Sequence, residues 1–291
     1  MIEKYYNGVI EQVAGGIGNV EHNSILVRYS NDFSIWDLES VNHYKDQTDI
    51  FFTCHEFSYN KIAEAYEPYL GLIRQMFHKY CSGTLEEFME ECDVYKLQRP
   101  VFESYFEKGF CERTEQILID EVEYEQERMR NSIVTMLQKL SEIRPVVIVL
   151  NRFQLASKST MQLSNSLLQV KNKNIGIVLG VNDVQSIPEF AHEEWDAICE
   201  SMDDRNMVYH IGNAGRNMEP DVMDYYSDYE SDDGYRKLNN LVYFLDFDQA
   251  NHHLSKIERR IKFDNFTISE KKHYQLLLLQ IMVSVLQRDI A

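Results

Sequence analysis

Short apolar runs alternate with longer segments of helical spacing along this chain. Runs of strand length occupy residues 24–29, 49–54, 146–150, 175–181 and 206–212. The third and fourth runs are apolar on both faces, which is typical of strands that helices cover on both sides. Strands that alternate with helices in this way predict an α/β domain with a mainly parallel sheet.

The predicted helices fill the space between these runs. They cover 2–14, 35–44, 59–80, 113–142, 159–169 and 195–202, with shorter helical pieces over 84–110 around a break at Pro100. Pro68 lies inside the third of these segments, so we expect that helix to begin or restart there.

An acidic segment interrupts the pattern at residues 217–235. Its 219–233 stretch carries seven Asp and Glu side chains, which is typical of a solvated loop or linker. A second interpretation is a docking segment for a protein partner, because tyrosines lie among the acids: Tyr225, Tyr226 and Tyr229. The sequence leaves both interpretations open.

The chain after this segment has helical spacing to its end. Residues 241–261 are similar to the start of a tetratricopeptide-type repeat, in which a small residue such as Ala250 lies where paired helices approach closely. Such repeats need about three units for stability, so we expect further repeats and an output domain beyond residue 291. We therefore predict an α/β domain, an acidic linker and a truncated helical segment: 1–216, 217–235 and 236–291.

The charge of the chain limits its partners. Among 291 residues there are 29 Lys and Arg against 47 Asp and Glu, a formal charge of −18. This balance disfavours direct nucleic-acid binding and anchoring on an anionic membrane. The N-terminus has no signal-peptide core, and no apolar run approaches the ~18 residues of a membrane span. We expect a soluble, cytoplasmic protein.

Cysteine and histidine positions do not indicate a metal site. The five cysteines are widely spaced and form no CxxC pair. The triplet Cys54-His55-Glu56 has no second cluster at ligand spacing. His252 and His253 are adjacent, so on a helix they face different ways. We expect no bound metal.

The middle of the chain carries a more specific signal. A helix leads through Arg144-Pro145 into the apolar strand 146–150, which is followed by a characteristic run: Phe153, Gln154, Ala156, Ser159 and Thr160. In this order, residues 128–182 resemble the ATPase core of the signal-transducing P-loop NTPases (the STAND group), which are related to AAA proteins. Residues 51–73 resemble the second strand of that family and the helix after it. The resemblance implies a core of the kind found in large bacterial transcription regulators and cyclases.

The phosphate-binding residues of that family are replaced here. A working P-loop reads G-x-x-x-x-G-K-[ST], in which backbone amides and the lysine hold phosphate and the hydroxyl holds Mg²⁺. After strand 24–29 the chain runs from Ser30 to Asp37 without a glycine, and Trp36 takes the lysine position. Asp37 takes the Ser/Thr position, and with Asp32 it would repel phosphate. Trp36 either plugs the pocket or belongs to the core.

A competing alignment puts the phosphate loop at residues 15–20. It keeps glycines, but Asn19 stands for the lysine and Val20 for the serine. No clear strand precedes it, so we prefer the first alignment. Both alignments lack the lysine.

The remaining parts of the family's site are also replaced. The resemblance puts metal-holding and catalytic acids at Asn151 and Arg152, and a phosphate-sensing arginine near Asn182. Because these parts are lost together with the lysine, we expect no catalytic residue, no cofactor and no ATP hydrolysis.

The leading hypothesis is a non-catalytic regulatory or scaffold module with a P-loop NTPase-like core. It would relay signals through protein contacts made by its helical repeats and the 219–233 loop, as a monomer or an oligomer. The alternative is an ATP-binding sensor or weak ATPase switch, since adenine contacts do not need the missing lysine. A transcription regulator is a third interpretation that rests on family analogy alone.

Overall fold

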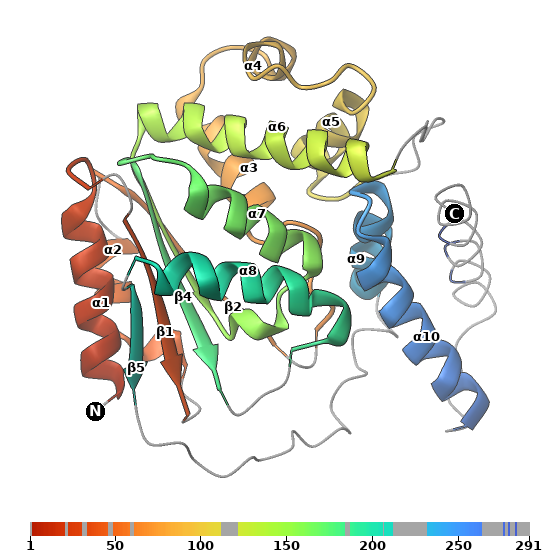
Figure 1. Ribbon diagram of the computed structural model, residues 1–291. Helices are drawn as coiled ribbons and strands as arrows, with labels where there is room; N and C mark the ends of the chain where they lie inside the picture. Colours follow the sequence, from red (N-terminus) through yellow and green to blue (C-terminus); the bar gives the residue numbers. More distant parts are fainter. Residues whose placement is uncertain are drawn as a thin grey trace.

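The computed structural model describes most of the chain. The described residues are 2–20, 23–30, 34–45, 49–58, 61–111, 122–183, 187–205, 207–211 and 232–263, together with Leu276, Leu279 and Val283. In these ranges a five-stranded sheet lies between helices on both faces (Figure 1). None of the helices in the same ranges is both long and apolar enough to cross a membrane.

All strands of this sheet run parallel. They are β1 (Asn23–Tyr29), β2 (Phe51–Glu56), β3 (Val146–Asn151), β4 (Ile175–Asn182) and β5 (Val208–Ile211). Their order across the sheet is β2-β3-β4-β1-β5. The predicted α/β class with a parallel sheet is confirmed. β3 and β4 are buried at every position, because helices cover both of their faces.

The N-terminal helix covers one face of the sheet. This face is formed by α1 (Ile2–Gly16), the short helix η1 (Ile35–Asp37) and α2 (Glu39–Lys45). Val147 and Val149 of β3 point into this first core. Ile148 and Leu150 point to the opposite side, since successive strand side chains alternate between the two faces.

The opposite face carries the longer helical regions. They include α3 (Tyr69–Tyr80), α4 (Leu85–Glu91), α5 (Arg99–Lys108), α6 (Val122–Ile143), η2 (Phe153–Leu155), α7 (Lys158–Gln169), η3 (Glu189–Ala191) and α8 (His192–Asp203). The C-terminal helices α9 (Asp232–Tyr243) and α10 (Phe247–Phe263) contribute Leu241 and Leu254 to the same hydrophobic core. They are therefore packed onto the α/β part.

Asp246, in the turn between α9 and α10, ties two helix starts together. Its carboxylate accepts hydrogen bonds from the amide of Ser159 in α7 at 2.9 Å and from the amide of Gln249 in α10 at 3.3 Å. The first amides of a helix have no partner within the helix, so one buried carboxylate satisfies both ends. This contact fixes the position of the C-terminal helices relative to α7.

The order in which the chain adds strands to the sheet changes direction beside β1 and β4. From β1 it passes through η1 and α2 to the far strand β2, and then returns through β3 and β4 to β5. The first connection uses one face of the sheet and the later ones use the other, as right-handed crossovers require. Open α/β sheets bind ligands at the carboxyl ends of their strands beside such a reversal.

Local predictions near glycine and proline have mixed outcomes. α3 begins directly after Pro68, as the sequence predicts. Pro100 lies in the first turn of α5 instead of at a break, because proline is tolerated where its missing amide would have no helical partner. Residues 15–20 end α1 and precede β1, and Gly18 donates its amide to the carbonyl of Lys173 just before β4. A phosphate loop follows a strand, so the competing alignment is wrong.

Candidate functional site

The carboxyl ends of β1, β3 and β4 bring the predicted site positions together. Tyr29, the last residue of β1, donates its hydroxyl to Oδ1 of Asn151 at 2.8 Å, and both side chains are buried. The amide of Asn182 donates to Oε1 of Gln154 at 3.2 Å. Neutral hydrogen bonds therefore hold Asn151 and Asn182, at two of the positions where the resemblance expects an acid and an arginine.

Tyr6 of α1 closes this cluster from the first face of the sheet. Burial raises the pKa of Tyr6 well above its ordinary value, and the charges of Tyr29 and Glu56 add to this effect. Gly180 of β4 leaves the space that the Tyr6 hydroxyl fills. A Cβ at this position would collide with that hydroxyl and would lie 2.7 Å from Oδ1 of Asn151. The space beside Asn151 is thus filled by the protein's own side chains.

Glu56, the last residue of β2, connects the loop after β1 with the residue that follows β3. Its Oε2 accepts hydrogen bonds from the amide of Ile35 at 3.0 Å and from the hydroxyl of Ser34 at 3.3 Å. Its Oε1 forms an ion pair with Nη1 of Arg152 at 3.2 Å. The side chains of this ion pair are only 11% and 18% exposed, so little water screens the charges.

The structure places the other predicted phosphate-site residues at the surface or outside its range. Ser30 is half-buried at the end of β1, and Asp37 is exposed in η1. Trp36 is 47% exposed, with Nζ of Lys45 4.5 Å from the centre of its ring. The expectation that Trp36 plugs a pocket or belongs to the core is therefore wrong, because η1 turns the side chain outward. Asp32 lies outside the described residues.

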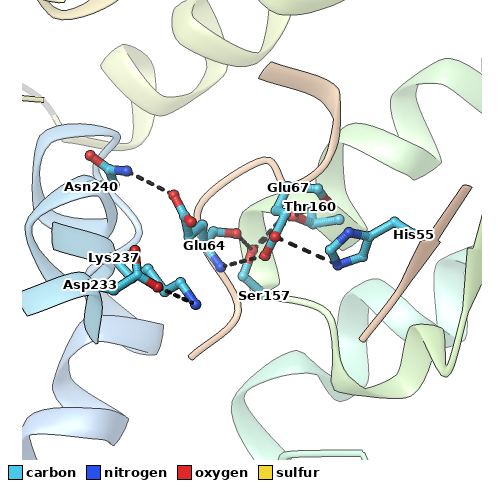
Figure 2. Close-up of polar contacts among 8 residues, drawn as sticks. All are labelled: His55, Glu64, Glu67, Ser157, Thr160, Asp233, Lys237 and Asn240. Carbon is cyan, nitrogen blue, oxygen red and sulfur yellow. Dashed lines mark hydrogen bonds and ion pairs between the residues drawn. The ribbon is translucent and has the colours of Figure 1, made fainter. Parts of the chain in front are cut away.

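A second polar cluster lies beside the first, between the carboxyl end of β2 and α9 (Figure 2). Glu64 and Glu67 occupy the segment that leads into α3. Nδ2 of Asn240 in α9 donates to Oε2 of Glu64 at 2.8 Å. The amide of Glu64 donates to Oε2 of Glu67 at 3.1 Å, and Nε2 of His55 lies 3.6 Å from Oε1 of Glu67. Two carboxylates therefore share one half-buried site.

The ionisation of these groups is strongly displaced. Burial, followed by the charge of Glu67, raises the pKa of Glu64 to about 7. Burial also raises the pKa of Glu67. His55 changes in the opposite direction, since burial lowers its pKa to about 4, with Lys61 and Lys237 adding to the effect. Burial therefore favours the uncharged form of all three side chains.

A cavity of about 100 Å³ borders the second cluster. Its wall includes His55, Phe57, Lys61, Glu67 and Lys237. In the described residues, no three His, Cys, Asp or Glu side chains are grouped so that they could hold a metal ion. The site offers ionisable groups and two lysines around a cavity with room for several water molecules or a small solute.

Sequence reasoning missed this second cluster. Glu64 and Glu67 stand three residues apart in a segment that was expected to be helical, where paired acids would be a solvated face. They differ from a solvated face because Asn240 covers Glu64 and donates a hydrogen bond to it, and Asn240 is 176 positions away from Glu64 in the sequence. No local pattern connects such residues. The one available signal was Pro68, which separates this segment from the helix that follows.

Comparisons with known proteins do not assign a function to these residues. The chain matches no model of a known protein family, and no curated protein matches it. The function is therefore inferred from the residues at the carboxyl edge of the sheet.

Proposed function

We propose that this chain is a non-catalytic regulatory or scaffold module that acts through protein contacts. Its core would be a P-loop NTPase-like domain that has lost its nucleotide chemistry, as in the resemblance to the signal-transducing NTPases. The protein surfaces proposed for this role are the C-terminal helices and the acidic 219–233 segment, of which 219–231 lie outside the described residues and 232–233 belong to α9.

The contacts of Glu56 are the observation that carries the proposal. In the preferred alignment, the loop after β1 is where backbone amides should meet phosphate. Here the amide of Ile35 and the hydroxyl of Ser34 donate to the Glu56 carboxylate instead. A phosphate would have to displace that carboxylate, which Arg152 also holds. Position 36 is a tryptophan and supplies no positive charge to attract the phosphate. Little binding free energy therefore remains for a nucleotide.

The end of β3 supports the same conclusion. Mg²⁺ prefers carboxylate oxygens and bound water, and the family's acids supply them. The corresponding side chains are the amide of Asn151 and the guanidinium of Arg152, which is a permanent cation. Asn151 is also fully buried, with Oδ1 engaged by Tyr29. This pair offers a divalent cation no negative charge.

Thermal unfolding with ATP, ADP or GTP, each with Mg²⁺, tests the proposal. We expect the same melting temperature in every case and no release of phosphate. A nucleotide at 100 times its dissociation constant would add ~2.7 kcal/mol to the unfolding free energy, a shift of several degrees that is easily detected.

Two variants make this test decisive. If ATP is hydrolysed, Asn151→Ala separates turnover at this edge from a contaminant, and Asn131→Ala on the exposed side of α6 is the matched control. Turnover that Asn151→Ala abolishes and Asn131→Ala preserves would overturn the proposal. A melting shift without turnover would favour the alternative, an ATP-binding sensor, over a scaffold.

A further inference from the structure

A groove of about 550 Å³ lies at the amino ends of the strands, on the opposite edge of the sheet from Asn151. One wall is the turn 171–174, which joins α7 to β4 and whose Asn174 carbonyl accepts the amide of Val146 at the start of β3. The other wall is a single face near the carboxyl end of α6, because its residues recur at helical spacing: Thr135, Gln138, Lys139 and Glu142. The groove is therefore separate from both polar clusters described above.

Hydrogen bonds to neighbouring elements fix the turn that forms this wall. The carbonyl of Lys173 accepts the amide of Gly18, just after α1, at 2.7 Å. Oδ1 of Asn172 accepts the amide of Asn174 at 2.8 Å, and Nδ2 of Asn172 donates to the hydroxyl of Ser141 in α6 at 3.4 Å. The backbone that carries the groove is thus preformed, so a ligand would not have to order it.

The groove is basic although the chain is acidic. Three lysines line it, Lys139 from α6 and Lys171 and Lys173 from the turn, and all three are exposed. Glu142 is the one acid among the described lining residues, so the local formal charge is +2. The whole chain carries −18. Positive charge is therefore gathered here against the balance of the molecule, and it favours an anionic ligand.

The ion pair that Lys139 forms within the chain is weak. Its Nζ lies 3.9 Å from Oε2 of Glu91 in α4, and the two side chains are 47% and 67% exposed. An exposed pair of this kind contributes little free energy, because water screens both charges. A carboxylate that enters the groove can therefore replace Glu91 at small cost.

The surroundings of the lysines favour carboxylates over phosphate. The carboxyl ends of α6 and α7 flank the groove (Figure 1). Helix carboxyl ends carry partial negative charge, whereas phosphate sites usually use the amino end of a helix. A compact dianion would be opposed there, while carboxylates spread along a peptide can each meet one lysine. A nucleic acid is disfavoured by the charge of the whole chain.

We propose that this groove binds an acidic segment of a protein partner, whose carboxylates pair with Lys139, Lys171 and Lys173. This inference goes beyond the proposed function and does not depend on whether nucleotide binds at the carboxyl edge of the sheet. It gives the chain a contact surface at the opposite edge, with the opposite sign of charge. Because the net charge of the chain repels acidic proteins, the groove determines where such a partner docks.

Fluorescence anisotropy of a labelled, end-blocked hexaglutamate peptide tests the groove in the full chain. We expect saturable binding at about 20 mM salt that weakens as salt rises to about 200 mM, because exposed charges are screened. A hexaglutamine peptide should not bind. The triple variant Lys139→Gln/Lys171→Gln/Lys173→Gln should weaken hexaglutamate binding about tenfold or more, since three exposed ion pairs are lost.

Two further variants assign the binding to the groove. Lys4→Gln/Lys96→Gln/Lys108→Gln removes the same charge from exposed positions outside the groove. It should bind hexaglutamate within about twofold of the wild type. Glu142→Gln removes the acid that lines the groove and should tighten binding by about twofold to threefold. A misfolded protein could not produce this gain.

Three results would overturn the proposal. They are no binding of hexaglutamate at low salt, an equal loss of binding in the two triple variants, and displacement of the bound peptide by millimolar inorganic phosphate at constant ionic strength. The last result would assign the groove to a phosphate-bearing ligand. These outcomes are distinct from the nucleotide test above, because that test is read out with Asn151→Ala at the other edge of the sheet.

Discussion

Glu56 and the Glu64–Glu67 pair lie at the same edge of the sheet but are compensated differently. Glu56 meets a guanidinium and two hydrogen-bond donors. Glu64 accepts a hydrogen bond from a neutral amide, the charge of Glu67 opposes its ionisation, and the nearby Lys237 forms an ion pair with Asp233. A guanidinium keeps its charge at every accessible pH, whereas the Asn240 amide that Glu64 meets carries none. The charge of Glu56 is therefore balanced by its direct partners, and the charges of Glu64 and Glu67 are balanced only in part.

The largest effect should come from filling the space beside Asn151. Gly180→Ala places a methyl group against the Tyr6 hydroxyl and Oδ1 of Asn151, inside the closed region. We expect it to lower the free energy of unfolding by about 3 kcal/mol, since a packed core between two helix layers has no room to adjust. Chemical denaturation measures this loss.

Gly8→Ala is the matched control for this substitution. Gly8 lies on the exposed side of α1, and a Cβ there would meet no atom within 4 Å. Alanine favours the helix by about 0.8 kcal/mol, so this variant should be as stable as the wild type or more stable. A Gly180→Ala protein of wild-type stability would mean that the cluster around Asn151 is loosely packed and the site is open.

The next effect should come from separating Glu56 from Arg152. A double-mutant cycle with Glu56→Gln and Arg152→Gln should give a coupling free energy of about 1–3 kcal/mol, because both side chains are mostly buried. The control is the cycle of Arg28→Gln and Asp183→Asn on the same edge, whose side chains are each 34% exposed. That pair should give less than about 1 kcal/mol. Equal couplings would remove the distinction between a closed and a solvated part of this edge.

The smallest effect should come from Trp36→Ala. The ring is half exposed and its one described ring contact is with Lys45, so the loss should be about 0.5–1 kcal/mol. Urea unfolding of the two proteins measures it. A loss above about 2 kcal/mol would show that Trp36 covers the phosphate position after all.

The sequence predicts the sheet better than the sites. Runs such as 146–150 and 175–181 match β3 and β4 closely, because strands covered on both faces are apolar at every position. The positions that the resemblance assigns to the end of the third strand and of the fourth, Asn151 and Asn182, lie at the ends of β3 and β4 as the sequence predicts. The outward turn of Trp36 could not be predicted, because it depends on how Ile35 packs into the first core.

The carboxylate pair shows why the rest was missed. A burial-dependent pKa depends on what covers the side chain, and Glu64 is covered by residues of α9 that follow it by more than a hundred positions. The same holds for Glu56, whose partner Arg152 directly follows β3, the strand that the sheet places next to β2. Partners of this kind can be identified only once the arrangement of the strands and helices is known.

The long separation between Glu64 and Asn240 also bears on how the protein is made. Ribosomes add about 5–20 residues per second, so roughly 10–35 s pass between the synthesis of the glutamate and that of the asparagine 176 positions later. During that interval the segment before α3 and the start of α7 are without the C-terminal helices that cover them. The apolar surface that Phe244 later fills stays uncovered during that interval, and α9 and α10 complete a core that the first strands began.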